Sequence, residues 1–137
     1  MIDIVDSSIA RKKVVESVAQ ASAGAIVTFD GTIRNQSRNK PVTHLYYEAH
    51  PEMALKELKT ICDQAMHRWP LNDISIVHRV GRMEIGESSV FIAVSSAHRV
   101  DAFAACQFAI DTLKTTVPIW KKEHYEDGEV WIEGYKQ

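Results

Sequence analysis

The sequence has little cysteine and none of the common metal-binding spacings, and both shortages narrow the possible chemistry. Its only cysteines among 137 residues are Cys62 and Cys106, which fall on the apolar faces of predicted helices. We expect two buried free thiols rather than a disulfide or a nucleophile. No CxxC, HxH or HExxH spacing occurs, so no metal site is indicated and we expect no metal or cofactor.

The sequence also lacks a long apolar run and an excess of basic charge. The longest apolar run, around VFIAVSSA, is far too short to cross a bilayer. The N-terminus MIDIVDSS is acidic and has no signal-peptide pattern, so we expect a cytoplasmic protein without a membrane partner. The net charge of −2 makes the chain as a whole an unsuitable nucleic-acid binder, and no aromatic RNA-binding signature is present. Any basic site must therefore be local.

What the sequence does contain is typical of one globular domain spanning residues 1–137. Hydrophobic residues make up 45% of the chain and charged residues 25%, without repeats, low-complexity tracts or a linker. A chain of this length can bury a core without disulfides or metals.

Hydrophobic periodicity predicts the order β-α-β-β-α-β-β-α-β-β, which is typical of an α+β domain with a largely antiparallel sheet. The predicted strands are 2–5, 24–35 with a possible bulge at Gly31, 42–50, 73–84, 88–98, and a final hairpin turning at Asp127–Gly128. The predicted helices are 9–22, capped by Ser7 or Ser8 and closed by Gly24, then Pro51 to Trp69, ended by Pro70, and 99–116. Residues 35–41 form a polar, mobile loop in this prediction.

A candidate anion site lies where the strand 88–98 passes into the helix 99–116. The free N–H groups of a helix start, together with His98 and Arg99, suit a phosphate or a carboxylate. The alternative is that Ser95 or Ser96 caps the helix while Arg99 pairs with a surface acid.

Lys114 lies in the last turn of the same helix, at the edge of an apolar stripe. The stripe consists of Phe103, Cys106, Ile110, Leu113 and Val117. Lys114 either faces a pocket or complements the negative end of the helix dipole. Phe108 faces away from the stripe, which suggests a second buried side of the helix and a subunit contact.

Two further lysines follow in the sequence PIWKKE. Strand alternation places Lys121 on the same side as Ile119 and Glu123, and Lys122 on the other. One of the two lysines can point inward, but both also suit a protected edge strand. Arg34 ends an earlier strand, and His78 and Arg79 are expected in strand packing and surface pairing.

Several segments together resemble the large, catalytic subunit of molybdopterin synthase. The resemblance runs from about Gly24 to Glu133, through GAIVTFDGTIRN, YYEAHPEMA, HRVGRMEIGESSVFIAVSSAHRVDAFAACQFAIDTLKTTVPIWKKE and DGEVWIE. It implies an α/β hammerhead-type fold with three helices. It also implies a sulfurtransferase of molybdenum cofactor biosynthesis that needs no metal.

The family resemblance implies specific partners and a substrate. The family forms a homodimer that binds two small ubiquitin-like sulfur-carrier subunits, giving a heterotetramer. The carrier's C-terminal Gly-Gly thiocarboxylate delivers sulfur to cyclic pyranopterin monophosphate, and two such transfers form the dithiolene of molybdopterin.

Carried over by position, the family's active-site lysines are Lys114 and Lys121, acting as general acid/base groups and anion stabilisers. The substrate-binding positions implied are Thr32, Ile33, Arg34, His98, Arg99, Lys114, Lys121, Lys122 and Glu123, with His98 and Arg99 as phosphate binders. The loop 35–41 departs from the family in lacking a glycine. A different class of function is also open, in which a non-catalytic subunit holds an acidic protein tail in a cationic cleft.

Overall fold

The computed structural model describes residues 1–37, 40–125 and 128–133, and within them the chain forms an α+β fold of three helices and nine strands. The helices are α1 (Arg11–Val18), α2 (Pro51–Arg68) and α3 (Arg99–Thr116). The strands are β1 (Ile2–Val5), β2 (Ala25–Thr32), β3 (Gln36–Ser37), β4 (Lys40–Ala49), β5 (Leu71–Arg79), β6 (Gly81–Met83), β7 (Ser88–Ser96), β8 (Ile119–Tyr125) and β9 (Gly128–Glu133).

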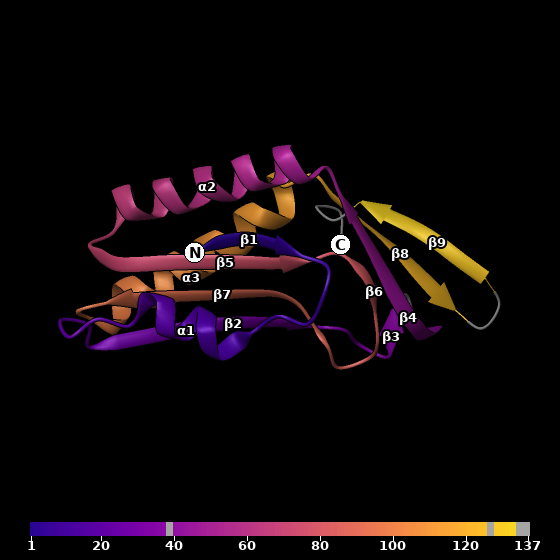
Figure 1. Ribbon diagram of the computed structural model, residues 1–137, viewed down its shortest axis with the longest axis horizontal. Helices are drawn as coiled ribbons and strands as arrows, with labels where there is room; N and C mark the ends of the chain where they lie inside the picture. The colour runs from indigo at the N-terminus through magenta and orange to yellow at the C-terminus, as the bar shows by residue number, and fades with distance from the viewer. Residues whose placement is uncertain (38–39, 126–127, 134–137) are drawn as a thin grey trace.

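The strands form two sheets that meet near the middle of the chain's long axis (Figure 1). The first sheet has the order β1-β5-β7-β2, in which only the β1–β5 pair is parallel. The second has the order β3-β4-β8-β9, with β6 also paired to β4, and all of its pairs are antiparallel. The predicted, largely antiparallel α+β architecture is therefore confirmed.

The helices cover both faces of the first sheet and give the domain two apolar clusters. The larger cluster lies under α2 and α3 and continues into the second sheet through residues such as Leu45 and Ile119. The smaller one lies under α1, where Val14 and Val18 pack on Val77 and Phe91. The central strand β7 is buried at every position, as expected for a strand covered on both sides.

The first helix is shorter than its periodicity predicts. It spans Arg11–Val18, its N-cap is Ala10 without a side-chain cap bond, and neither Ser7 nor Ser8 caps it. Ile9 is buried with the α1 cluster, so packing of this residue fixes the chain entry in place of a serine cap. Gly24 does not close the helix. A Cβ at this residue would lie 2.3 Å from the carbonyl oxygen of Ala97, so the glycine permits a close approach of two backbones.

Two predicted segments divide differently in the structure. The polar loop 35–41 contains a short ladder, in which Gln36 and Ser37 of β3 pair with Pro41 and Lys40. Residues 38–39 of that loop and Asp127 of the final turn lie outside the described residues. The predicted strand 73–84 is two strands in different sheets, because Gly81 has φ of 92° and turns the chain between β5 and β6.

The predicted bulge near Gly31 is confirmed by a register shift between Gly31 and Thr32.

The third helix matches its predicted bounds, and its predicted apolar face is buried at Cys106, Ile110, Leu113 and Val117. Phe103 is 61% exposed, so its place in the stripe was wrong. Alanines 102, 105 and 109 are fully buried instead, which allows α3 to approach the sheet and α2 closely. Phe108 packs on Trp69 of its own chain, with ring centroids 5.4 Å apart, and the Arg68 guanidinium lies 4.7 Å from each ring. The structure thus gives Phe108 an intrachain contact, while the subunit contact suggested by periodicity stays a prediction.

Both cysteines are free and buried, as predicted. Burial raises the pKa of the Cys62 thiol to about 12 and that of the Cys106 thiol to about 11. Neither sulfur is therefore a competent thiolate nucleophile near neutral pH.

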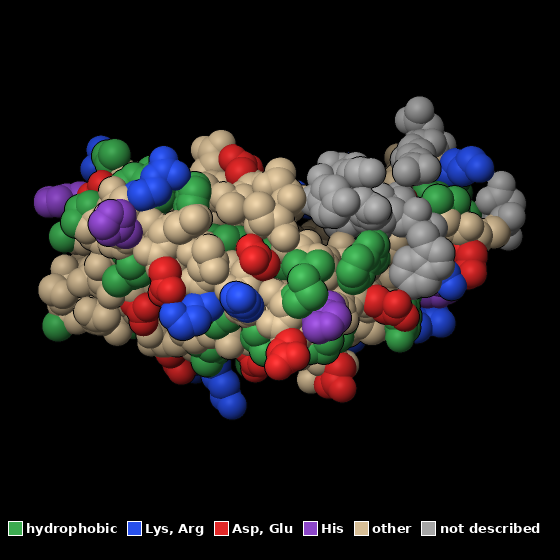
Figure 2. Space-filling model, turned by 90° about the horizontal axis from the view of Figure 1, so that it is seen from above, with side chains coloured by type: hydrophobic (Ala, Val, Ile, Leu, Met, Phe, Trp, Pro, Cys, Tyr) green, Lys and Arg blue, Asp and Glu red, His purple; other side chains and the backbone are tan. Residues whose placement is uncertain are grey.

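Figure 2 shows the molecule from the side of α2, where acidic and basic side chains are interspersed over the surface. No helix within the described residues is long and apolar enough to cross a membrane. The outward face of α2 carries a short ion pair, Lys59 to Asp63 at 2.8 Å, which is an ordinary feature of a solvated helix.

The turn at Gly81 separates β5 from β6, and its contribution to stability can be tested by substitution. Gly81→Val should lower the free energy of unfolding by about 1–2 kcal/mol, because a Cβ disfavours the left-handed region. A Cβ at Gly81 would meet no atom within 4 Å, so the loss should come from the backbone alone. Gly81→Asn should lower the free energy of unfolding by less, since asparagine tolerates positive φ. Urea denaturation measures both, and equal losses would contradict the explanation.

Candidate functional site

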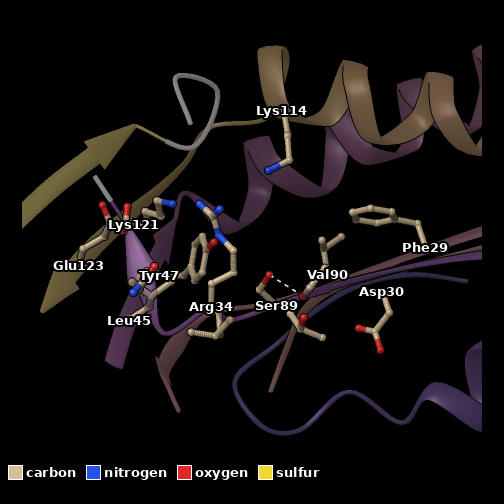
Figure 3. A pocket seen from close by; sticks show the side chains of 15 residues that line it. Phe29, Asp30, Arg34, Leu45, Tyr47, Ser89, Val90, Lys114, Lys121 and Glu123 are labelled. Carbon is tan, nitrogen blue, oxygen red and sulfur yellow. Dashed lines mark hydrogen bonds between the residues drawn. The ribbon is translucent and has the colours of Figure 1, made fainter. Parts of the chain in front are cut away.

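A cleft of about 680 Å³ lies at the junction of the two sheets, between the end of β2 and the inner face of β4 and β8. Its walls come from segments far apart in the sequence, including Phe29 of β2, Tyr47 of β4 and Val90 of β7. Figure 3 shows three cationic side chains, Arg34, Lys114 and Lys121, approaching this space from different elements. The arrangement forms the local basic site that an acidic chain requires for an anionic ligand.

Lys114 enters the cleft from the last turn of α3. The helix positions it firmly, because the neighbouring Leu113 and Val117 are buried in the core. Burial lowers the pKa of Lys114, and the nearby Arg34 lowers it further. A lysine perturbed in this direction is better suited to proton transfer near neutral pH than a free one.

Lys121 points inward from β8. Alternate residues of this strand, Ile119, Lys121, Glu123 and Tyr125, are all at most 8% exposed. Strand alternation predicts that the two lysines diverge but not which is inside, and the structure answers this because Ile119 and Tyr125 join the core. Glu123 is 1% exposed, and one of its carboxylate oxygens accepts a hydrogen bond from the Tyr125 hydroxyl at 3.1 Å.

Lys122 lies on the opposite face of β8. Its ammonium is 2.9 Å from a carboxylate oxygen of Glu129 on β9, and His124 contacts the other oxygen of Glu129 at 3.2 Å. Lys122 does not line the cleft. The expectation that Lys122 points away from Lys121 is confirmed.

The segment after β2 places Thr32, Ile33 and Arg34 at the mouth of the cleft. It is clamped by two backbone bonds, since the Ile33 amide donates to Glu87 and the Ile33 carbonyl accepts from Gly86. The Ile33 side chain is 4% exposed and joins the core, so only its backbone faces a ligand. Thr32 and Arg34 are exposed.

His98 and Arg99 lie at the other end of α3. Fifteen residues separate Arg99 from Lys114, which places them roughly 22 Å apart along the helix axis at 1.5 Å per residue. Figure 1 shows α3 running along the first sheet, with its start remote from the second sheet. Within one chain the pair therefore cannot share a small ligand with Lys114. No side chain caps the helix, and the Ser96 hydroxyl bonds instead to the carbonyl of His98.

Two residues of the region were not singled out as site residues from the sequence. Tyr47 is buried on the inner face of β4 and lines the cleft. His78 is buried behind it, and its ring packs edge-on against Tyr47 at 5.3 Å. The strand packing expected for His78 is confirmed, as is the pairing of Arg79, whose guanidinium lies 2.7 Å from Glu87. Only the sheet junction brings His78 to the site, so no sequence signal indicated it.

The described residues offer this site few metal ligands. Among residues 1–37, 40–125 and 128–133 no group of three His, Cys, Asp or Glu side chains could hold a metal ion. The cleft instead combines cations with Tyr47 and a buried carboxylate at Glu123. The chemistry of this lining suits a small phosphorylated or carboxylated molecule and groups that exchange protons with it.

Comparison with known proteins gives one consistent family. Residues 4–116 match the family model described as MoaE protein. The chain is 46% identical over 129 residues to the molybdopterin synthase catalytic subunit of Halalkalibacterium halodurans, covering 94% of this chain and 83% of that one. It is 42% identical over 123 residues to the protein of that name from Pyrococcus abyssi, covering 90% and 83%.

Solved structures agree with these relatives. The crystal structure of molybdopterin synthase from Staphylococcus aureus matches with a TM-score of 0.91 and 42% identity, covering 94% of each chain. A complex of subunits 1 and 2 of the molybdopterin-converting factor from Helicobacter pylori matches with a TM-score of 0.78 and 18% identity, covering 95% and 88%. The second likeness shows the shared fold.

The electrostatic effect of Arg34 on the pKa of Lys114 can be tested without any substrate. Arg34→Gln should raise the pKa of Lys114, because removing a nearby cation favours the charged ammonium. The ¹³Cε resonance of Lys114, followed by NMR against pH, measures this pKa. Arg82→Gln, which removes a cation paired with Glu84 on β6, should leave it unchanged. An equal response to both substitutions would show that Arg34 does not act on Lys114.

Proposed function

The chain belongs to the MoaE family, and we propose on this premise that it is the catalytic subunit of a molybdopterin synthase. In this proposal it transfers two sulfurs from the C-terminal thiocarboxylate of a small carrier protein to cyclic pyranopterin monophosphate, forming the molybdopterin dithiolene. The observation that supports the proposal best is the convergence of Lys114, Lys121 and Arg34 on one partly buried cleft.

The cleft suits both reactants because each is an anion. The pterin carries a cyclic phosphate, and the incoming tail ends in a thiocarboxylate. Arg34 offers a planar, permanently charged guanidinium at the mouth, which fits phosphate or carboxylate oxygens. Lys121 is only 8% exposed, so a charge held there interacts strongly with a bound anion.

Proton transfer is assigned mainly to Lys114. Sulfur attack on the pterin side chain, opening of the cyclic phosphate and loss of water each require a proton to be given or taken. The lowered pKa of Lys114 makes its ammonium easier to deprotonate than that of a free lysine, and its position on α3 limits its motion. Lys121 then stabilises the negative charge that develops on sulfur or phosphate oxygen.

The sulfur donor in this proposal is a small ubiquitin-like carrier protein with a Gly-Gly tail. The Helicobacter pylori structure is described as a complex of subunits 1 and 2, and one of its chains shares the fold of this chain. The tail must enter the cleft in extended form, since glycines carry no side chain that would obstruct a narrow entrance. Thr32 and Arg34 line the cleft at that entrance.

A homodimer allows His98 and Arg99 of one chain to contact a substrate bound at Lys114 of the other chain. Roughly 22 Å of helix lies between Arg99 and Lys114 in one chain, more than a pterin phosphate spans. In the proposed dimer, which completes a heterotetramer with two carriers, the pair from one chain reaches the phosphate bound in the other chain's cleft. Exposed apolar side chains near that end of α3, Val100 at 69% and Phe103 at 61%, favour a covered face there.

A non-catalytic subunit that only holds an acidic tail would use the same cations, and neighbouring cations lower the pKa of a lysine in either case. The enzyme is favoured because relatives that cover 90% and 94% of this chain are named catalytic subunits.

Replacing Lys114 or Lys121 with alanine should reduce sulfur transfer by on the order of 10²-fold or more, since each removes a group that acts in the transition state. Lys122→Ala is the matched control, because Lys122 lies on the other face of β8. This variant should lose far less of its sulfur-transfer activity. Conversion of the pterin precursor by the purified protein with thiocarboxylated carrier measures this. Wild-type turnover in both the Lys114 and the Lys121 variants would contradict the catalytic assignment.

Subunit complementation tests the shared site. Arg99→Ala and Lys114→Ala should each be impaired alone, yet mixing and reassociating them should restore about one quarter of the sites, because half of the dimers are mixed and each has one intact site. Light scattering should give twice the 15.4 kDa chain mass. Mixtures no more active than the separate variants would show that His98 and Arg99 serve no partner's cleft.

A further inference from the structure

A buried histidine stands directly behind the cleft and has no part in the mechanism above. His78 of β5 is 4% exposed, and its Nδ1 lies 2.8 Å from the carbonyl oxygen of Arg79. A carbonyl can only accept, so Nδ1 carries the proton and Nε2 is the acceptor nitrogen. Burial lowers the pKa of His78 to about 4, so the ring is neutral in this one tautomer at neutral pH.

His78 and Lys114 line the same small cavity. Its volume is about 30 Å³, enough for one water molecule, and Tyr47, Ser89 and Val90 line both this cavity and the cleft. The rest of its wall is apolar, from Ile110, Leu113, Val117 and Ile119. The ammonium of Lys114 is close enough to disfavour a charge on His78, which places the two groups in one electrostatic environment.

The polar groups that face this pair come from β4, β7 and the segment after β2. Tyr47 of β4 stacks edge-on against the imidazole, Ser89 of β7 donates its hydroxyl to the Gly31 carbonyl, and Arg34 acts on Lys114 from the cleft side. The Arg79 carbonyl occupies the donor Nδ1 of His78. The acceptor at Nε2 is therefore the group suited to receive a proton donor such as the lysine.

We propose that His78 is a positioning residue for Lys114, with Nε2 accepting a hydrogen bond from the lysine ammonium through one water in the small cavity. This inference rests on the proposed function only for the consequence to turnover. A hydrogen bond to the ammonium favours its charged form, whereas burial and Arg34 disfavour it. His78 thus limits how far the lysine is deprotonated and fixes where its amine points.

Two substitutions at His78 separate the two ring nitrogens. His78→Asn keeps a donor near the Arg79 carbonyl but loses the distal acceptor, while His78→Gln keeps an acceptor at the distal position. The Asn variant should lower the pKa of Lys114, reduce kcat by roughly 10-fold or more with little change in KM, and move the acid limb of the pH profile down. The Gln variant should recover most of each change.

The NMR titration of Lys114 in the free protein does not depend on sulfur transfer, so it tests the inference even if the proposed function fails. An unchanged Lys114 pKa in the Asn variant, or equal shifts in the Asn and Gln variants, would overturn the positioning role. Loss of turnover without a change in that pKa would also overturn it.

A reciprocal measurement covers the case in which the Asn variant does not fold. Lys114→Met replaces a side chain at the cleft and leaves His78 in place, so the ¹⁵N resonance of His78 Nε2 can be compared with that of the unmodified protein. It should move towards the value of an acceptor without a partner. An Nε2 resonance that is the same with and without Lys114, or a tautomer protonated at Nε2, would contradict the proposal.

Discussion

The convergence of cationic side chains at the seam between two sheets is the constraint on which the rest of this structure depends. Lys121 is 8% exposed, and it shares its cleft with the more exposed Lys114 and Arg34. Like charges brought close together oppose folding, so the surrounding core must hold them in place. The apolar cluster that joins α3 to β4 and β8 provides that support, through buried neighbours such as Leu113 and Ile119.

The support also explains why the cleft has its shape. Gly31 lets β2 pass close to β7, because a Cβ there would lie 2.7 Å from a methyl of Val90. The register shift beside it directs the following residues to the mouth of the cleft. Arg79 and Glu87 then fix the turn that clamps Ile33. Burial is the main cause of the lowered pKa of Lys114, and a rigid mouth of this kind keeps Arg34 near enough to lower it further.

The third helix runs along the first sheet to the cleft, and its two ends differ in chemical character. Its last turn carries Lys114 into the cleft, while its first turn presents Arg99 beside the exposed side chains of Val100 and Phe103. A site that uses both ends requires a second chain, because a helix is a rigid spacer of fixed rise. Behind the last turn, the buried His78 provides a neutral acceptor that complements the weakened ammonium.

Local patterns in the sequence determined the class of fold, most element bounds and the identity of the cationic residues. The apolar period predicted α3, and the Asp127–Gly128 turn signal predicted the β8–β9 hairpin, because these signals act within a few residues. The tertiary structure alone decided which lysine of β8 is buried, since alternation defines two faces but not which meets a core. It likewise decided that Arg99 is remote from Lys114, that Gly81 sends neighbouring strands into different sheets, and that His78 lies behind the cleft. Each of these depends on contacts between residues far apart in the chain, which no local pattern encodes.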